Sequence, residues 1–257
     1  MSLFREDSAL SRLNREGRID DAPDDLLELL AVARRIAEAS GGAFDATVQP
    51  LWRAWADAQR EGRLPTREAI AAARALVDWR GVVVEGRRVR LARPGMGVTL
   101  NGIAQGWAAD RVRAVLADHG IAHALVDAGE YAMRGRDREG LRWSLGLADP
   151  IDESRLMARL LADGRCVATS SNAQLRFTAD GRHHHILDPR TGDSPPEVIG
   201  VTVAAPSGAV ADALTKVFFI AGPGRAAALA REWGVDVLWV TGRGEWHATR
   251  GLDLRVG

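Results

Sequence analysis

The 257 residues suffice for one large domain or two small ones, and a composition of 46% hydrophobic and 26% charged residues excludes a disordered or fibrous protein. Lys plus Arg and Asp plus Glu number 34 each and the basic residues are dispersed, so neither a nucleic acid nor a membrane surface is indicated as a partner. Cys166 is the single cysteine, which excludes an intrachain disulfide and predicts a buried thiol. No stretch approaches the roughly 20 apolar residues of a transmembrane helix, so the chain itself is expected to be soluble.

The first hundred residues are predicted to be mainly helical. Asp7 and Ser8 can cap a short helix that runs through Leu13, and a longer helix begins at Pro23 and is stopped by Gly41. The other elements expected here are a helix from Pro65 to about Trp79 and two strands within 81–95 that turn at Glu85 and Gly86.

The rest of the chain mixes strands and helices. Residues 154–161 fit either a strand or a helix. Strands are expected in HALVDAG, LRWSLGL, CVATS, VIGVTVAAP and VDVLWVTG, a hairpin that turns at Asp180 and Gly181 in QLRFTADGRHHHIL, and helices in GAVADALTKVFFIAG and PGRAAALAREWG. No repeat, low-complexity linker or change of composition divides the sequence, so we expect a single mixed α and β domain over residues 1–257.

The stretch 99–111, TLNGIAQGWAADR, has the pattern of a strand end, a tight turn and a helix start. Residues 98–100 are predicted to be a strand, Asn101 and Gly102 a turn, and an amphipathic helix follows. Glycine lets a backbone approach a ligand closely, and the unpaired N–H groups of a helix start attract negative oxygens. The pattern suits a phosphate, although many such connections in α/β domains bind nothing.

Three clusters of polar residues stand in otherwise apolar or turn-like sequence. The first is GAFDATVQP, in which the Asp45 carboxylate can accept hydrogen bonds from a heterocycle or can simply cap a turn. The second is HHHILDPRTG, in which strand alternation places His183 and His185 on one face and His184 on the other. Two His can bind a metal, but no third ligand lies at a recognisable spacing. The sharper interpretation is that one His acts as a general base, because the ordinary imidazole pKa suits proton transfer near neutrality.

The third cluster is Asp212 with Lys216, four residues apart and therefore on one face of a helix. An exposed pair of this kind contributes little energy. The neighbouring residues are apolar nearly all round, which predicts a largely buried helix. A buried Asp needs a cation, which either a metal ion or Lys216 can supply.

Several sequence motifs, taken in their order along the chain, resemble those of the ApbE family, the FAD:protein FMN transferases. They are DSALSRLN, GAFDATVQPLW, TLNGIAQGWAADRV with ALVDAGE, and VATSS with HHHILDPRTG and VTVAAPSGAVADALTKVFFIAG, and together they span nearly the whole chain. NGIAQG, DAGE and HHHILDPRTG are most similar to the NosX-like branch, which is associated with nitrous-oxide reductase maturation. The resemblance implies an α+β domain of the ApbE, T-fold-like type.

The resemblance implies a Mg²⁺-dependent enzyme whose substrate is FAD. Such an enzyme splits the pyrophosphate, releases AMP and attaches FMN by a phosphoester to a Thr or Ser of an acceptor flavoprotein. Hydrogen-bond donors and a cation must neutralise the negative charge of the phosphates. The acceptor hydroxyl needs a base to remove its proton. The N-terminal residues carry no signal peptide. The resemblance implies a periplasmic location and a membrane-bound acceptor if a longer precursor exists.

The resemblance also assigns roles by position. His185, three residues before Asp188, matches the family's base. The residues matched to FAD binding are Phe4, Ala43, Phe44, Asp45, Thr99, Gln105 and Leu187. The residues matched to the metal site are Gly102, Asp212, Thr215 and Lys216.

Several positions depart from the family pattern. Thr99 stands where the family usually has Asp, and Gln105 where it has Lys or Glu. The family's metal-binding Thr lies four residues after the Asp, where this chain has Lys216, while Thr215 comes one residue early. An ammonium there can take the position of the cation, or Thr215 can reach the metal through a local helix adjustment. The family's first strand, with an FAD-contacting Met, precedes DSALSRLN, so we expect that Met1 is an internal methionine or a misplaced start and that this strand is missing.

Two alternatives to the transferase remain open. An FAD pyrophosphatase would use water in place of the acceptor hydroxyl and release FMN and AMP. A non-catalytic FAD-binding maturation protein is favoured by the departures at Thr99, Gln105 and Lys216, whereas the retention of His185 and Asp212 favours an enzyme. A generic nucleotide site gains no support, because neither GxxxxGK[ST] nor GxGxxG occurs.

Overall fold

The computed structural model describes residues 2–256, which divide into two compact units. The first unit contains residues 2–102 and 175–195, and the second contains residues 103–174 and 196–256. The chain therefore leaves the first unit after Gly102 and returns to it once. The single domain over 1–257 stays a prediction, and the expectation about Met1 lies outside the described residues.

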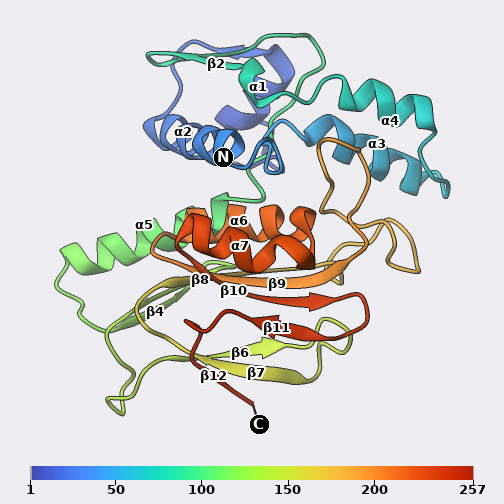
Figure 1. Cartoon of the computed structure of the whole chain (residues 1–257). Coiled ribbons are helices and arrows are strands. Elements are labelled where there is room, and N and C mark those ends of the chain that lie inside the picture. The colour runs from blue at the N-terminus through green and yellow to red at the C-terminus, as the bar shows by residue number, and fades with distance from the viewer. Residues whose placement is uncertain (1, 257) are drawn as a thin grey trace. The chain divides into compact units, whose positions relative to one another are not determined.

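The first unit combines helices with a small antiparallel sheet (Figure 1). Its helices are α1 (Ala9–Glu16), α2 (Asp24–Ala39), α3 (Gln49–Arg60), α4 (Arg67–Arg74) and the short 3-10 helix η1 (Trp79–Gly81). Its strands are β1 (Arg18–Ile19), β2 (Val82–Glu85) and β3 (Arg88–Leu91), in the order β1-β3-β2. Ser8 and Thr66 cap α1 and α4, because their hydroxyls accept hydrogen bonds from the N–H groups of Ser11 and Ala69.

Two predictions for this unit are wrong. The helix expected from Pro65 to about Trp79 ends at Arg74, and the chain starts again as η1 because Asp78 accepts a hydrogen bond from the Arg80 N–H at 3.1 Å. The strand expected at 98–100 does not form. The Asn14 side chain takes the place of a neighbouring strand there, since its amide bonds both the N–H of Val98 at 2.7 Å and the carbonyl of Val98 at 2.8 Å.

The turn expected at Asp180 and Gly181 is present, but no regular strands flank it. The Gly181 N–H donates to the Thr178 carbonyl at 3.0 Å, and an isolated antiparallel bridge joins Arg176 and His184. Phe177 turns into an apolar cluster, where its ring lies 5.6 Å from the ring of Trp55.

The second unit contains two antiparallel sheets and the remaining helices. The larger sheet has the order β11-β10-β9-β8-β5-β4, with β4 (Ala124–Asp127), β5 (Tyr131–Arg134), β8 (Cys166–Ser171), β9 (Val198–Ala205), β10 (Asp236–Thr241) and β11 (Trp246–Ala248). The smaller has the order β12-β7-β6, with β6 (Ser144–Ala148), β7 (Leu156–Leu161) and β12 (Leu254–Arg255). The helices are α5 (Ala104–Asp118), α6 (Gly208–Ala221) and α7 (Pro223–Trp233). Residues 154–161, which fitted either element, thus contain a strand.

The large sheet of this unit is covered on both faces. The three helices pack on one face, and the small sheet lies on the other (Figure 1). Apolar residues from both sheets form the core between them: Met133, Leu145, Leu147, Leu160, Val167, Leu238 and Val240. Burial on both faces explains why β9 reads as a nearly continuous apolar run. The mixed α+β fold predicted from the sequence is confirmed.

Candidate active site

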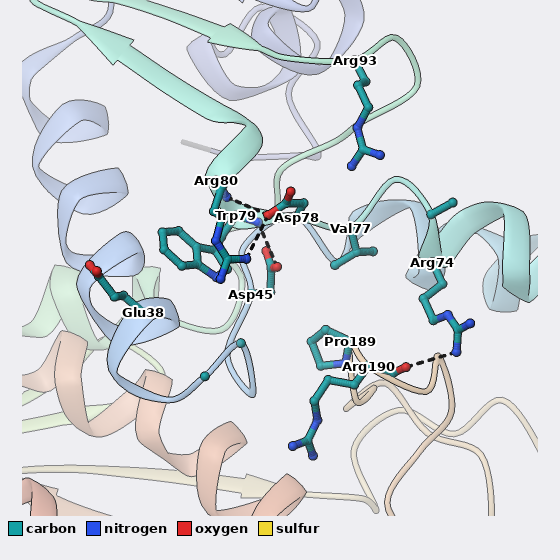
Figure 2. A pocket seen from close by; sticks show the side chains of 13 residues that line it. Glu38, Asp45, Arg74, Val77, Asp78, Trp79, Arg80, Arg93, Pro189 and Arg190 are labelled. Atoms are coloured by element: carbon teal, nitrogen blue, oxygen red, sulfur yellow. Dashed lines mark hydrogen bonds and ion pairs between the residues drawn. The ribbon is translucent and has the colours of Figure 1, made fainter.

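A pocket of about 640 Å³ opens in the first unit (Figure 2). Asp45, Asp78 and Trp79 come together on one side of it, and Pro189 and Arg190 lie on the other. The remaining lining residues are Glu38, Gly41, Gly42, Arg74, Ala75, Val77, Arg80 and Arg93. The pocket therefore joins the end of α2, the η1 turn and the DPRTG loop.

Asp45 anchors one wall of this pocket. Its Oδ1 accepts hydrogen bonds from the Thr47 N–H at 2.7 Å and the Thr47 hydroxyl at 2.6 Å, and its Oδ2 accepts one from the Trp79 N–H at 3.0 Å. The residue is buried, and burial raises its pKa although these hydrogen bonds act in the opposite direction. Asp45 is thus a turn cap that also lines a pocket.

Four arginines line the pocket, and the sequence analysis missed them. Arg190 forms a bidentate pair with Asp188 at 2.9 and 2.7 Å, and its carbonyl accepts a hydrogen bond from Arg74 at 3.1 Å. The Arg80 guanidinium lies over the Trp79 ring, 4.5 Å from its centroid. Together with Arg93 they favour an anionic ligand. Because these residues are dispersed between positions 74 and 190, no local signal in the sequence could have revealed the cluster.

The three consecutive histidines have different environments. His183 Nδ1 lies 2.8 Å from Asp193 Oδ1, and its ring stacks on Trp55 with centroids 4.5 Å apart. His184 is 2% exposed, with the Ile186 N–H 3.3 Å from Nδ1 and the Pro195 carbonyl 3.4 Å from Nε2. Both contacts suit the neutral ring, and burial lowers the pKa of His184 to about 4. His184 is therefore a structural histidine.

His185 is the half-buried histidine that the sequence matched to a base. Its Nδ1 lies 3.2 Å from the carbonyl oxygen of Leu175, which favours a proton on Nδ1 and makes Nε2 the basic nitrogen. Buried His184 lies between the half-buried His183 and His185, so the predicted alternation of side chains is present without a regular strand. Leu187 is buried in the cluster with Leu51 and Phe177.

The other residues matched to FAD differ in exposure. Phe4 is 88% exposed, whereas Ala43 and Phe44 are buried directly before Asp45. Thr99 is half-buried and its N–H donates to the Ala46 carbonyl at 2.7 Å. These residues belong to the first unit, while Gln105 is an exposed residue at the start of α5 in the second.

Asp212 and Lys216 form a buried ion pair on α6. Lys216 Nζ donates to Asp212 Oδ1 at 2.5 Å and to the Asp212 carbonyl at 3.1 Å. Asp212 Oδ2 accepts a hydrogen bond from the Gly106 N–H, in the first turn of α5, at 3.2 Å. The Asp212 side chain is 1% exposed and that of Lys216 is 19% exposed. The predicted buried helix is therefore present, and on it Lys216 pairs with Asp212.

The Thr215 side chain points to the main-chain carbonyl of Asp212 and not to its carboxylate. Its hydroxyl donates to the Asp212 carbonyl at 2.6 Å and lies 2.7 Å from the Ser170 hydroxyl. No group of three or more His, Cys, Asp or Glu side chains within residues 2–256 is placed to hold a metal ion. Gly102, also matched to the metal, is the last residue of the first unit before α5.

Glu130 is a second buried carboxyl group near this pair, and it was missed as a functional residue. Its Oε2 accepts a hydrogen bond from the Thr169 N–H at 2.9 Å. Burial first, and then the Asp212 charge, raise the pKa of Glu130 to about 8, although Lys216 acts in the opposite direction. The signal in the sequence was a carboxyl group directly before the apolar strand β5.

The predicted buried thiol is confirmed. Cys166 is 0% exposed, and its Sγ lies 3.2 Å from Asp110 Oδ1. Burial and the Asp110 charge raise the pKa of Cys166 to about 12. Asp110 itself caps α6, since its Oδ2 accepts hydrogen bonds from the Ser207 hydroxyl at 2.8 Å and the Ala209 N–H at 3.1 Å. The thiol is therefore packed and unreactive at neutral pH.

Comparisons with known proteins show the family and the fold of the chain. The family model described as the ApbE family matches residues 1–239. The FAD:protein FMN transferase of Treponema pallidum is 32% identical over 100% of this chain and 77% of its own length, and that of Escherichia coli K12 is 30% identical over 97% and 74%. The crystal structure of the ApbE protein from Thermotoga maritima has a TM-score of 0.89 at 29% identity and covers 97% of this chain and 84% of its own. The flavin transferase ApbE from Vibrio cholerae has a TM-score of 0.82 at 28% identity, covering 97% and 82%.

The chain belongs to the ApbE family and is a transferase. The family predicted from the ordered motifs is thereby confirmed. Among the described residues, none of the helices combines the length and the apolar character needed to cross a bilayer.

Proposed function

We propose that the chain is an FAD:protein FMN transferase that splits FAD and attaches FMN through a phosphoester to a Thr or Ser of an acceptor flavoprotein. The observation that carries this proposal is the fixed cation at a helix start: Lys216 is held by Asp212, which also bonds the Gly106 N–H in the first turn of α5. A pyrophosphate needs positive charge of this kind as the bond to its leaving phosphate breaks, and the Lys216 ammonium supplies it. Relatives that match nearly the whole chain are named for this reaction.

The proposed reaction has one displacement at phosphorus. The acceptor hydroxyl oxygen forms a bond to the FMN phosphorus, the bond from that phosphorus to the bridging oxygen breaks, and AMP leaves with that oxygen. His185 receives the hydroxyl proton on Nε2, since the Leu175 carbonyl favours a proton on Nδ1. The resemblance assigns FAD contacts to Phe4, Ala43, Phe44, Asp45, Thr99, Gln105 and Leu187.

The pocket of the first unit supports a site for part of the FAD molecule. Its volume of about 640 Å³ lies in the range of small-molecule sites. The Trp79 ring lies in its wall with the guanidinium groups of Arg80 and Arg34 over it, and Arg93 adds positive charge. Guanidinium groups favour the phosphates of such a ligand.

The residues present do not fit the Mg²⁺ ion that the resemblance implies. Mg²⁺ requires near-octahedral oxygen ligands, but Asp212 Oδ1 already holds an ammonium and its Oδ2 already accepts a backbone N–H. The Thr215 hydroxyl donates a hydrogen bond to the Asp212 carbonyl and contacts the Ser170 hydroxyl. A divalent ion about 4 Å from the ammonium would meet a repulsion of about 8 kcal/mol at an effective dielectric constant of about 20. We therefore derive no step through a metal.

The proposal extends to the acceptor protein and to the cellular location. We infer a periplasmic location, a membrane-bound flavoprotein acceptor and membership of the NosX-like branch. The amino-acid sequences of the motifs NGIAQG, DAGE and HHHILDPRTG support this branch. A cytoplasmic signal from a reporter fused to the full-length natural gene product would contradict the location.

The test is to incubate the purified chain with FAD, with and without a Thr-containing acceptor domain, and to measure AMP by chromatography and protein-bound flavin by fluorescence after denaturing electrophoresis. We expect AMP and covalently bound flavin to appear together, and only with the acceptor hydroxyl present. Release of AMP with free FMN in the absence of acceptor would make the chain an FAD pyrophosphatase. Tight FAD binding without any AMP would make it a flavin-binding maturation protein.

A further inference from the structure

We propose that the Lys216 ammonium is a built-in replacement for a divalent cation, so that this chain binds and cleaves FAD without Mg²⁺. The inference rests on the proposed function for its substrate, and on the contacts of α6 for the cation. It changes the cofactor requirement of the site and makes the activity insensitive to chelators.

The position of the ammonium follows from helix geometry. Residues four apart share a helix face, so Lys216 reaches back over one turn to the carboxylate and carbonyl of Asp212. Its 2.5 Å contact with Oδ1 is a charge-assisted hydrogen bond in a buried setting. The other carboxylate oxygen, Oδ2, accepts a hydrogen bond from the Gly106 N–H of α5 at 3.2 Å. A metal ion would have to displace this ammonium.

Asp212 and Lys216 carry opposite single charges, so the carboxylate already has a cation beside it. Mg²⁺ is usually held by one or two carboxylates together with substrate phosphates. Here the carboxylate that would hold the ion is already paired.

The ammonium is also able to meet a substrate. An ammonium has three N–H donors, and the two contacts with Asp212 account for two of them. With 19% of its side chain exposed, Lys216 can direct the third donor to a phosphate oxygen. Asp212 thus positions Lys216, and Lys216 supplies the positive charge.

The first experiment measures metal binding without turnover. Mn²⁺ is titrated into the wild-type chain and followed by calorimetry and by the paramagnetic resonance signal of free Mn²⁺. We expect no saturable binding up to millimolar concentration. One Mn²⁺ per chain, lost in Asp212→Asn, would overturn the proposal.

The second experiment measures anion binding in chelator. Quenching of flavin fluorescence gives the FAD affinity in EDTA, and inorganic pyrophosphate competes as a phosphate probe. Lys216→Met should weaken the binding of FAD and of pyrophosphate at least about tenfold each. Lys216→Arg should retain most of the affinity for both. Because Lys216→Met leaves Asp212 buried and unpaired, the neutral pair Asp212→Asn with Lys216→Met is included to keep the fold. Unchanged affinity in that folded double variant would contradict the proposal.

The outcomes separate this inference from the proposed function. If no AMP or covalent flavin appears under any condition, the transferase proposal fails while the Mn²⁺ and pyrophosphate titrations still judge the role of Lys216. If turnover occurs but EDTA abolishes it, the transferase stands and the built-in cation is wrong. Turnover that persists in EDTA supports both.

Discussion

Gly106 of α5 and Gly208 of α6 approach so closely that a Cβ atom on Gly106 would lie 2.0 Å from the Gly208 carbonyl oxygen. The same Cβ would lie 2.8 Å from the Asp212 Cβ. Only glycine allows the first turn of α5 to reach the Asp212 carboxylate with its N–H. The contact between the two helices and the placement of Asp212 are therefore one structural feature.

We expect Gly106→Ala to destabilise the protein, because the backbone of α6 must move to admit the methyl group. The expected loss is about 1–3 kcal/mol, typical of overpacking. Chemical unfolding followed by circular dichroism measures it. Gly224→Ala is the matched control, since a Cβ there meets nothing within 4 Å and alanine favours a helix. Equal stability of the two variants would show that α5 and α6 are not tightly packed here.

His184 should make the protein sensitive to acid. Its pKa is about 4 in the folded chain and about 6.5 when unfolded, so the folded state binds the proton more weakly. The stabilisation is complete above pH 6.5 and is lost as the pH falls toward 4, with about 2 kcal/mol lost between pH 7.5 and pH 5. His184→Gln should reduce this difference in urea unfolding measured at both pH values. An identical difference in the variant would rule out His184 as its source.

Glu130 should make the folded state less stable as the pH rises, whereas His184 does so as the pH falls. Its pKa is raised to about 8 in the folded chain, so the folded state holds the proton more tightly than the unfolded state. Stability from this group is complete below about pH 4.5 and is lost as the pH rises toward 8. Glu130→Gln keeps an acceptor for the Thr169 N–H and should be more stable than wild type at pH 8.5, by on the order of 2 kcal/mol. A melting series from pH 5 to pH 9 tests this, and parallel curves for the two proteins would refute it.

His185→Ala should abolish FMN transfer while FAD remains bound. The basic Nε2 would be lost, whereas the pocket around Asp45 and Trp79 would keep its lining. AMP release and flavin fluorescence quenching measure the two effects separately. His183→Ala is a control in the same segment, because His183 packs on Trp55 and pairs with Asp193. Normal turnover in His185→Ala would remove this residue from the mechanism.

Local pattern in the sequence was sufficient for most helices and for strands such as β8, β9 and β10, whereas α3 and β5 were not predicted. The cap residues Ser8 and Thr66 and the apolar periodicity identified α1, α2 and the start of α4. The pattern failed at 98–100 because the partner of that segment is the side chain of Asn14 and not a strand. A contact across 84 residues has no local signature.

The sequence by itself determined the family, the buried character of α6 and the pairing of Asp212 with a cation, because ordered motifs and helical spacing are properties of the chain. It left open whether a metal ion or the Lys216 ammonium would be that cation. Only the tertiary structure shows that Asp212 lies between the Gly106 N–H and the Lys216 ammonium. Likewise, only the fold gathered arginines from distant segments around one pocket. Such choices depend on which groups from separate segments share a buried volume, and spacing along the chain does not encode that.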